Sequence, residues 1–410
     1  MGRFTFQTGK IGEDSKSGNT LFLVSVILLW GLGIFTVLIS TPDAVARLPF
    51  LSEKSRYYFV ARQLMFSFMG IIGFLFFAFI PFRLLRKFLG FFVIGSLIFC
   101  ILPILPFFGK ASHGAARWVN IPHLGRFQPS EFAKLAVVMY LANLFDKYLV
   151  LDSDSQKEYG LYPMLGLFLF VIVIILQKDF STSVFIFLVG TIMFFASGAK
   201  MSWFLPVMIL AIPVILLLIF IEPYRINRLI AFFKPEELNM TTGYQRATSE
   251  NVISLGGIWG NGVGTGMSVL NIPEIQTDYI FAGWVNSMGL VGVIAYCVVL
   301  VFFAIRGYKI AVTTPSRFGS YGSFGFTTLI LLQSLINIGV VCGALPTTGI
   351  PLPFFSSGGS SMIATFCMCG FILNASSTTD DEDGNILNLG NRRSGSESGM
   401  ENLDGVEINL

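Results

Sequence analysis

Asp278 is the acidic residue whose position most invites a chemical role, because it directly precedes a long apolar run. A carboxylate placed there can cap a helix, and it can also accept a proton as a general base. Glu274 lies four residues earlier. If the segment is helical, the two carboxylates share a face and the pKa of one of them rises, although a solvated loop acid is the simpler interpretation of Glu274.

Lys134 lies inside another apolar run, which opens with Ser130 and Glu131. Ser130 suits a helix cap and Glu131 the positive end of the helix dipole, which places Lys134 one turn further along the same face. A lysine that enters a membrane is costly unless it is paired or solvated, so it is either a functional cation or the partner of Glu131. Arg117, beside Trp118, is either a second functional cation or an interfacial anchor.

Three other features offer weaker signals. Asp179, before Ser181 and Thr182, suits a helix cap and polar support of a site equally well. The glycine run at 256–264 lacks the following Lys-Ser/Thr of a nucleotide loop, so flexible backbone is the better interpretation. The spacing of the five cysteines and two histidines predicts no metal site.

The composition assigns the chain to the membrane. Hydrophobic residues occupy 54% of the 410 positions and charged residues 12%, against roughly 25% charged residues in a soluble domain. The net charge of +3 is small, and no basic stripe indicates nucleic-acid binding. The sequence therefore predicts an all-α integral membrane protein without a nucleic-acid partner.

Apolar runs of about 20 residues, long enough to cross the hydrocarbon core as helices, predict about ten spans in one bundle. They lie at residues 20–40, 58–80, 88–107, 131–149, 161–177, 182–198, 203–221, 280–304, 322–342 and 357–376. An even number places both termini on one side, and the basic cluster at 83–87 favours the cytoplasm. Residues 1–19 are then a cytoplasmic segment, and the acidic residues 377–410 a disordered cytoplasmic tail.

The outer connections carry the candidate residues. The seventh and eighth spans are joined by a loop at 222–279, and loops of this length are usually functional. Its short apolar stretch at 229–233 suits the membrane interface. The other unusual outer segments are 108–130, 177–181 and 343–356.

Five motifs recur in these outer segments, in a fixed order. They are GAARW (114–118) with FQPSEFAK (127–134), QKDFST (177–182), GYQ (243–245) with the glycine run, PEIQTDYIF (273–281), and GALPTTGIPLP (343–353) with SSGGSS (356–361). Together they resemble the SEDS (FtsW/RodA/SpoVE) family, and the resemblance spans residues 20–376. The 127–134 motif and the run after it slightly favour the division-type branch over the elongation-type branch.

The resemblance implies an activity: a peptidoglycan glycosyltransferase of septal cell-wall synthesis, which polymerises a lipid-linked disaccharide (lipid II) and releases undecaprenyl pyrophosphate. It implies Asp278 as the base and Arg117 and Lys134 as pyrophosphate ligands. The accessory residues it implies are Trp118, Ser130, Glu131, Asp179, Gln245 and Glu274. The implied setting is the bacterial inner membrane, with a class B penicillin-binding transpeptidase and other divisome or elongasome proteins as partners. No cofactor follows from it, and a divalent cation is left open.

Several departures from the family pattern touch the site: Gln276 stands where histidine is common, and Ser357 where tyrosine is common. Asn286 and Ser287 replace two usual glutamates, and Lys178 replaces a usual proline. A transporter of the lipid-linked precursor fits the composition equally well, and a scaffold that has lost its activity is a weaker alternative. A long outer loop that ends in an acid favours the enzyme, because transporters usually place their key polar groups near the midplane.

Overall fold

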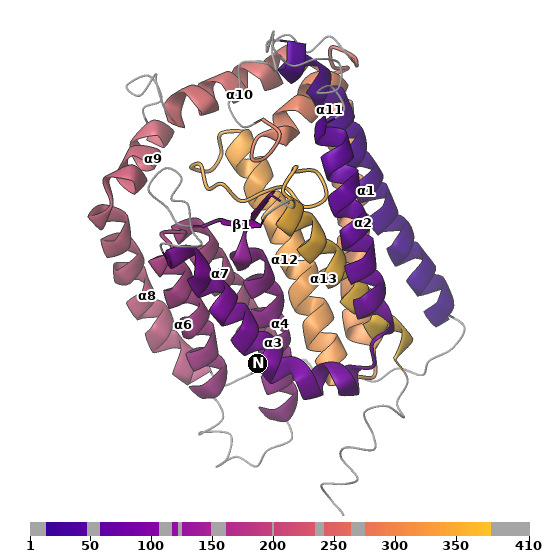
Figure 1. The fold of residues 1–410 in the computed structure, drawn as a ribbon, viewed down its shortest axis with the longest axis vertical. Coiled ribbons are helices and arrows are strands. Elements are labelled where there is room, and N and C mark those ends of the chain that lie inside the picture. Colours follow the sequence, from indigo (N-terminus) through magenta and orange to yellow (C-terminus); the bar gives the residue numbers. More distant parts are fainter. Residues whose placement is uncertain are drawn as a thin grey trace, which may run out of the picture.

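The computed structural model describes residues 14–46, 58–105, 117–121, 125–148, 161–198, 201–233, 242–263 and 275–378. Long helices fill most of these ranges and lie side by side in one bundle (Figure 1). They are α1 (Asp14–Ala46), α2 (Tyr58–Phe79), α3 (Phe82–Ile101), α4 (Pro129–Tyr148), α6 (Leu161–Leu176), α7 (Phe180–Ser197), α8 (Met201–Ile221), α11 (Ile280–Thr313), α12 (Arg317–Val341) and α13 (Gly359–Ser377). Each predicted span coincides with one of them, so the all-α membrane fold is confirmed.

Length and hydropathy identify 7 membrane-spanning candidates in the described part of the chain. They lie in α1, α2, α3 with the 3-10 turn Leu102–Ile104 that follows it, α7, α11, α12 and α13. The apolar residues of α6 form a shorter helix, Tyr162–Leu176. The count of ten spans stays a prediction.

Helices α3 and α12 begin five or six residues earlier than the hydropathy pattern predicts, and both starts include basic residues. α3 starts at Phe82, directly after Pro81, and so includes the basic cluster in its first turns. α12 starts at Arg317, where the Ser316 side chain accepts a hydrogen bond from the Gly319 N–H. Long basic side chains can extend from a helix end toward the interface, so charge does not mark where the helix ends.

Small residues let α13 pack closely against α2. A Cβ atom on Gly370 would lie 2.3 Å from the Phe74 carbonyl oxygen, and one on Gly359 would lie 2.4 Å from the Phe66 ring. Only glycine fits at such separations, which is how small residues bring membrane helices together. The serine- and glycine-rich motif at 356–361 thus fixes where α13 begins beside the other outer segments.

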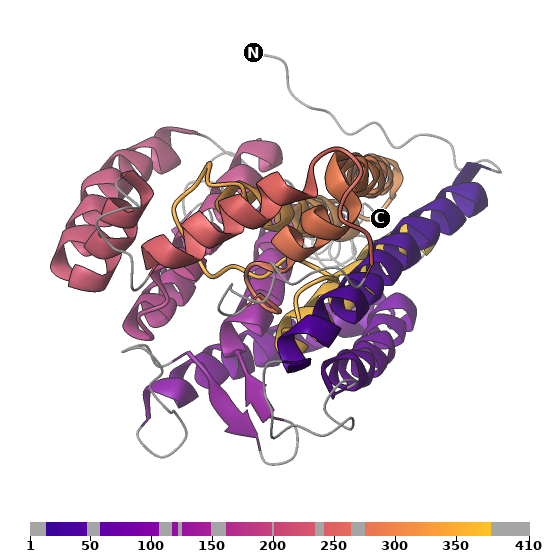
Figure 2. The same cartoon turned by 90° about the horizontal axis from the view of Figure 1, so that it is seen from above.

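Shorter elements gather at one end of the bundle. Strands β1 (Val119–Ile121) and β2 (Gly125–Phe127) form an antiparallel hairpin that the sequence did not predict, because three-residue strands carry too little periodicity. Helices α9 (Pro223–Phe233) and α10 (Thr242–Gly256) extend across the same end (Figures 1 and 2). The predicted long loop therefore contains two helices, and its apolar stretch is the last part of α9.

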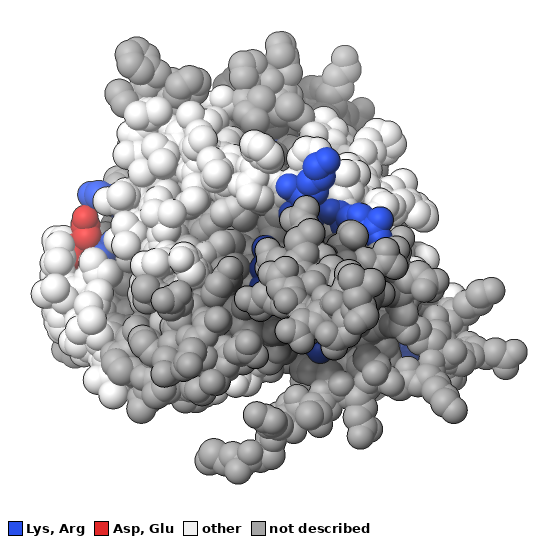
Figure 3. Space-filling model, turned by 90° about the horizontal axis from the view of Figure 1, so that it is seen from below, with Lys and Arg blue, Asp and Glu red and all other residues white. Residues whose placement is uncertain are grey.

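The opposite end of the bundle carries exposed cations. α3 and α12 begin there and α4 and α11 end there, and Figure 3 shows blue side chains from this side. The exposed cations among the described residues at this end include Arg83, Lys87, Lys147, Lys309 and Arg317. Arg126 and Lys178 are exposed at the hairpin end, so the orientation of the bundle in the membrane stays a prediction.

Single cysteines at Gly262 and Ser394 are expected to react oppositely with an impermeant thiol reagent, in a background without the five native cysteines. Gly262 is exposed after α10 and should react in intact cells. Ser394 lies outside the described residues and, as part of the predicted cytoplasmic tail, should react only after lysis. Labelling of both from outside would contradict the ten-span prediction, which places three spans between the two positions, and the reverse pattern would invert the orientation.

Candidate active site

Asp278 lies in a turn that directly precedes α11, whose N-cap is the next residue, Tyr279. Three successive carbonyls of this turn accept hydrogen bonds: Gln276 O from the Ser357 N–H at 2.8 Å, Thr277 O from Ser356 Oγ at 2.5 Å, and Asp278 O from Asn337 Nδ2 at 2.9 Å. The backbone that carries the candidate base is therefore fixed from two sides, by α12 and by the segment before α13.

The Asp278 carboxylate is half-buried beside a glycine. A Cβ atom on Gly349, which has a φ of 74°, would lie 3.5 Å from Asp278 Oδ2. Asp278 also acts on its neighbour Tyr279, whose pKa is raised mainly by burial and further by this carboxylate, while Arg228 and Arg246 lower it. Tyr279, the residue next to the candidate base, thus lies within the electrostatic reach of two arginines.

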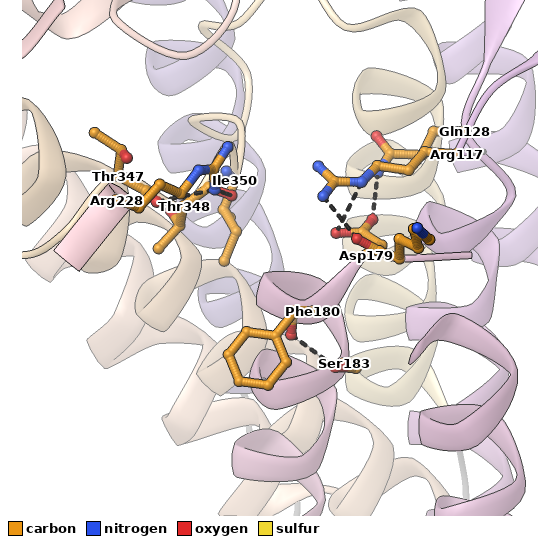
Figure 4. A network of polar contacts seen from close by, with 10 residues as sticks. Arg117, Gln128, Asp179, Phe180, Ser183, Arg228, Thr347, Thr348 and Ile350 are labelled. Atoms are coloured by element: carbon orange, nitrogen blue, oxygen red, sulfur yellow. Dashed lines mark hydrogen bonds and ion pairs between the residues drawn. The ribbon is translucent and has the colours of Figure 1, made fainter. Parts of the chain in front are cut away.

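Those two arginines come from α9 and α10 and hold the segment that contains Gly349. Arg228 Nη1 donates to the carbonyls of Thr347 at 3.0 Å and Thr348 at 3.3 Å (Figure 4). Arg246 Nη2 donates to the Gly343 carbonyl at 3.2 Å. Neither arginine was predicted from the sequence, because the carbonyls that they bind here lie about a hundred residues away and leave no motif.

Arg117 and Asp179 form a second cluster at the same end (Figure 4). Arg117 Nε lies 3.7 Å from Asp179 Oδ1, and Arg117 Nη2 donates to the Lys178 carbonyl at 2.9 Å. The other Asp179 oxygen accepts from Gln128 Nε2 at 3.1 Å, and within the described residues the side chain makes no capping bond to α7. The geometry favours polar support of Arg117 over helix capping as the role of Asp179.

Two further cations adjoin this cluster. Lys178, which has a φ of 61°, pairs with Glu222 at 3.1 Å. The Arg225 guanidinium lies 4.8 Å from the centre of the Phe180 ring. Burial lowers the pKa of Arg225, Glu222 opposes that shift and Arg117 adds to it. Arg117 and Arg225 are therefore close enough to repel each other, which makes this corner of the bundle a favourable place for an anion.

Lys134 is buried in the bundle. Its ammonium lies 2.7 Å from Glu131 Oε2 and donates to Gln333 Oε1 at 2.9 Å, and the lysine side chain is 1% exposed. The ion pair with Glu131, one of the two sequence interpretations, is present. A contact of Lys134 with pyrophosphate stays a prediction, and in this conformation the ammonium faces protein partners.

The remaining sequence candidates surround these contacts. Ser130 lies inside the first turn of α4 and is not its cap, and among the described residues its buried hydroxyl has no hydrogen-bond partner. Trp118 is half-buried directly before β1, and Gln245 is half-buried on α10 beside Arg246. Glu274 lies outside the described residues, so its predicted accessory role stays untested.

Within the part of the chain that the structure describes, no three His, Cys, Asp or Glu side chains gather as metal ligands. The dependence of the protein on a divalent cation therefore stays an expectation.

Comparison with known proteins places this geometry in a family. A model described as "Cell cycle protein" and built on FtsW, RodA and SpoVE matches residues 20–381. The chain belongs to the FtsW/RodA/SpoVE family. It is 33% identical to the probable peptidoglycan glycosyltransferase FtsW of Borreliella burgdorferi, over 88% of this chain and 98% of that protein. It is 32% identical to stage V sporulation protein E of Bacillus subtilis, again over 88% and 98% of the two chains.

Solved structures share the fold. A chain from a structure titled "Structural coordination of polymerization and crosslinking by a peptidoglycan synthase complex" matches with a TM-score of 0.70 and 23% identity, over 87% of this chain and 96% of that one. The rod shape determining protein RodA of Thermus thermophilus matches with a TM-score of 0.62 and 22% identity, over 87% and 95%.

The two departures from the family's usual acids lie at a break in α11. Gly289 has a φ of 64° and a ψ of −163°, and a Cβ atom there would lie 2.4 Å from Gly260 N. Asn286 Nδ2 donates to the Val252 carbonyl at 2.8 Å, and Ser287 O accepts from the Gly262 N–H at 3.2 Å. A glutamate could not donate as Asn286 does, so these residues attach the end of α10 to the broken helix.

Proposed function

We propose that this protein is a peptidoglycan glycosyltransferase that extends glycan strands from a lipid-linked disaccharide, lipid II, during septal cell-wall synthesis. The relatives named FtsW support this activity, and their similarity covers most of both chains. The observation that carries the proposal is the placement of Asp278: a carboxylate on a rigid turn, half-buried, at the end of the bundle that also holds Arg117.

The chemistry requires a base. The 4-hydroxyl oxygen of one lipid-linked disaccharide attacks the anomeric carbon of another, and the bond from that carbon to the pyrophosphate oxygen breaks. Asp278 takes the hydroxyl proton, which raises the nucleophilicity of the oxygen as the new glycosidic bond forms. Undecaprenyl pyrophosphate leaves with the electron pair of the broken bond.

The departing pyrophosphate requires cations where its charge develops. Arg117 is the best placed, because Asp179 and the Lys178 carbonyl orient its guanidinium while part of it stays exposed. Arg225 and Lys178 add positive charge nearby. Lys134 joins this group only if substrate binding opens the buried pair with Glu131.

The proposed setting follows from the same reaction. Glycan strands are made outside the cytoplasm, so the site lies on the outer face of the inner membrane, with both termini cytoplasmic. A class B penicillin-binding transpeptidase is the proposed partner, since it would crosslink the strands. One chain that shares this fold comes from a peptidoglycan synthase complex described as coordinating polymerisation and crosslinking.

The decisive experiment supplies purified protein in proteoliposomes with lipid-linked disaccharide, without ATP or an ion gradient. Glycan polymer on the outer side supports the glycosyltransferase. Movement of the intact lipid across the bilayer without polymer would support the transporter instead, and the absence of both would support the scaffold.

Arg117→Lys is expected to lower turnover roughly 10–100-fold, the equivalent of one lost charge-assisted hydrogen bond of about 1.5–3 kcal/mol. Lysine keeps the charge and loses the planar fork that binds phosphate at two points. Initial rates of polymer formation measure the effect. Arg126→Lys is the control, because Arg126 is an exposed arginine on β2 of the hairpin that follows Arg117. Equal rates for Arg117→Lys and wild type would contradict a pyrophosphate role for Arg117.

A further inference from the structure

Two buried amide side chains lie one turn apart on α12, and both face the segment beside the candidate base. Asn337 and Gln333 are each 2% exposed. Asn337 Nδ2 donates to two carbonyls, Asp278 O and Ile350 O, both at 2.9 Å. Gln333 Nε2 donates to the next carbonyl, Pro351 O, at 2.8 Å, while its Oε1 accepts from Lys134 at 2.9 Å.

Asn337 holds the carbonyl whose orientation depends on the ψ angle of Asp278 itself. The preceding carbonyls of the turn are fixed by Ser356 and Ser357. If the bond from Asn337 were missing, the peptide after Asp278 could rotate, and the carboxylate would turn with the Cα atom. A displacement of about 1 Å is enough to lower a catalytic rate on the order of 10²-fold.

The second bond of Asn337 ties the same amide to the segment that faces the carboxylate. Ile350 directly follows Gly349, whose Cα lies beside Asp278 Oδ2. The NH2 group of Asn337 therefore binds both the residue that carries the base and the segment that faces the carboxylate, and so fixes the distance between them. Gln333 continues the connection from Pro351 to the ion pair of Lys134 and Glu131.

We propose that Asn337 is a positioning residue for Asp278, and that Gln333 couples this position to the buried ion pair of α4. The inference rests on the proposed glycosyltransferase activity and deepens it, because it names the residues that set the geometry of the base. Neither amide is assigned a contact with the substrate. Asn337 acts through two backbone carbonyls, and Gln333 through one carbonyl and the Lys134 ammonium.

The chain contains a matched control for loss of a buried amide. Asn374 of α13 also donates from one Nδ2 to two carbonyls, Phe77 O at 2.9 Å and Ile80 O at 2.6 Å. It lies near the far end of α13, whereas the start of that helix reaches the site through Ser360 and Gln128. Asn337→Leu and Asn374→Leu therefore remove the same kind of contact, one beside Asp278 and one far from it.

The test compares both variants with wild type in the proteoliposome assay, with thermal unfolding measured in parallel. Asn337→Leu is expected to lower kcat about 10–100-fold while the apparent KM for lipid-linked disaccharide stays within about threefold, because binding groups are untouched and the base is displaced. Both variants lose one buried amide, so they are expected to lower the unfolding temperature by similar amounts. Asn374→Leu should nevertheless keep the kcat of the wild-type protein.

Asn337→Ser guards against a variant that does not fold, since its shorter side chain can donate to one carbonyl at most and should give an intermediate kcat. Wild-type kcat in either Asn337 variant would overturn the inference. So would an equal loss of kcat in Asn374→Leu, or a rise in KM at constant kcat. A wild-type protein that forms no polymer would overturn the proposed function, and the positioning role with it.

Discussion

Asp278→Asn is expected to lower polymerisation turnover by about 10²–10⁴-fold, the usual contribution of a general base. Asparagine keeps the size of the side chain and cannot accept the hydroxyl proton. The turn itself is held through backbone carbonyls, which the substitution leaves in place. Membrane insertion and thermal unfolding should therefore equal those of wild type. Initial rates of polymer formation in proteoliposomes measure the loss.

Glu222→Gln is the control for this loss. Glu222 is another carboxylate at the same end, 31% exposed, and it pairs with Lys178. A partly exposed ion pair contributes only about 0–1 kcal/mol, so this variant should polymerise within a few-fold of the wild-type rate. Full activity in Asp278→Asn, or an equal loss in Glu222→Gln, would remove Asp278 from the role of base.

Lys134→Met is expected to destabilise the protein by about 3–5 kcal/mol, because it leaves the Glu131 carboxylate buried without its cation. Glu131 is 3% exposed and its ion pair with Lys134 measures 2.7 Å. Removal of a lysine that had no partner would have the opposite sign, since it would relieve the cost of placing a charge in the membrane. The unfolding temperature of the purified protein distinguishes the two expectations.

The double variant Lys134→Met with Glu131→Gln separates charge balance from a direct role in chemistry. It removes both charges, so most of the lost stability should return. Lys147→Met, at the exposed end of the same helix, should leave stability unchanged. If the double variant is stable and still polymerises slowly, the ion pair also contributes to catalysis, through Lys134 at the substrate or through Gln333 and the position of the base. Unchanged stability in Lys134→Met alone would contradict the buried pair as a structural element.

The helices were predictable because the membrane imposes a single requirement. A segment that crosses lipid must satisfy its backbone internally and present apolar side chains, and the sequence shows both as long hydrophobic runs. The ends were less predictable. Arg83, Arg86 and Lys87 lie inside α3, although the span predicted from hydropathy begins only at residue 88. The hairpin of β1 and β2 was missed for lack of length.

The site was predictable where its residues belong to motifs. Asp278, Arg117 and Asp179 were all named from the sequence, and the structure pairs the last two. Asn337, Gln333, Arg228 and Arg246 were not named. Gln333 meets Lys134 across 199 positions, and the others bind backbone carbonyls that any residue could supply. Such contacts become visible only once the bundle brings distant segments together.

The central claim is that the protein joins sugars as it releases lipid pyrophosphate, and the ratio of the two products tests it most directly. Labelled lipid-linked disaccharide is supplied to the purified wild-type chain, and new glycosidic bonds and free undecaprenyl pyrophosphate are counted in the same sample. The proposed function predicts one pyrophosphate for each bond formed, with both products lost in Asp278→Asn. Polymer without an equal release, or release that persists in Asp278→Asn, would contradict it.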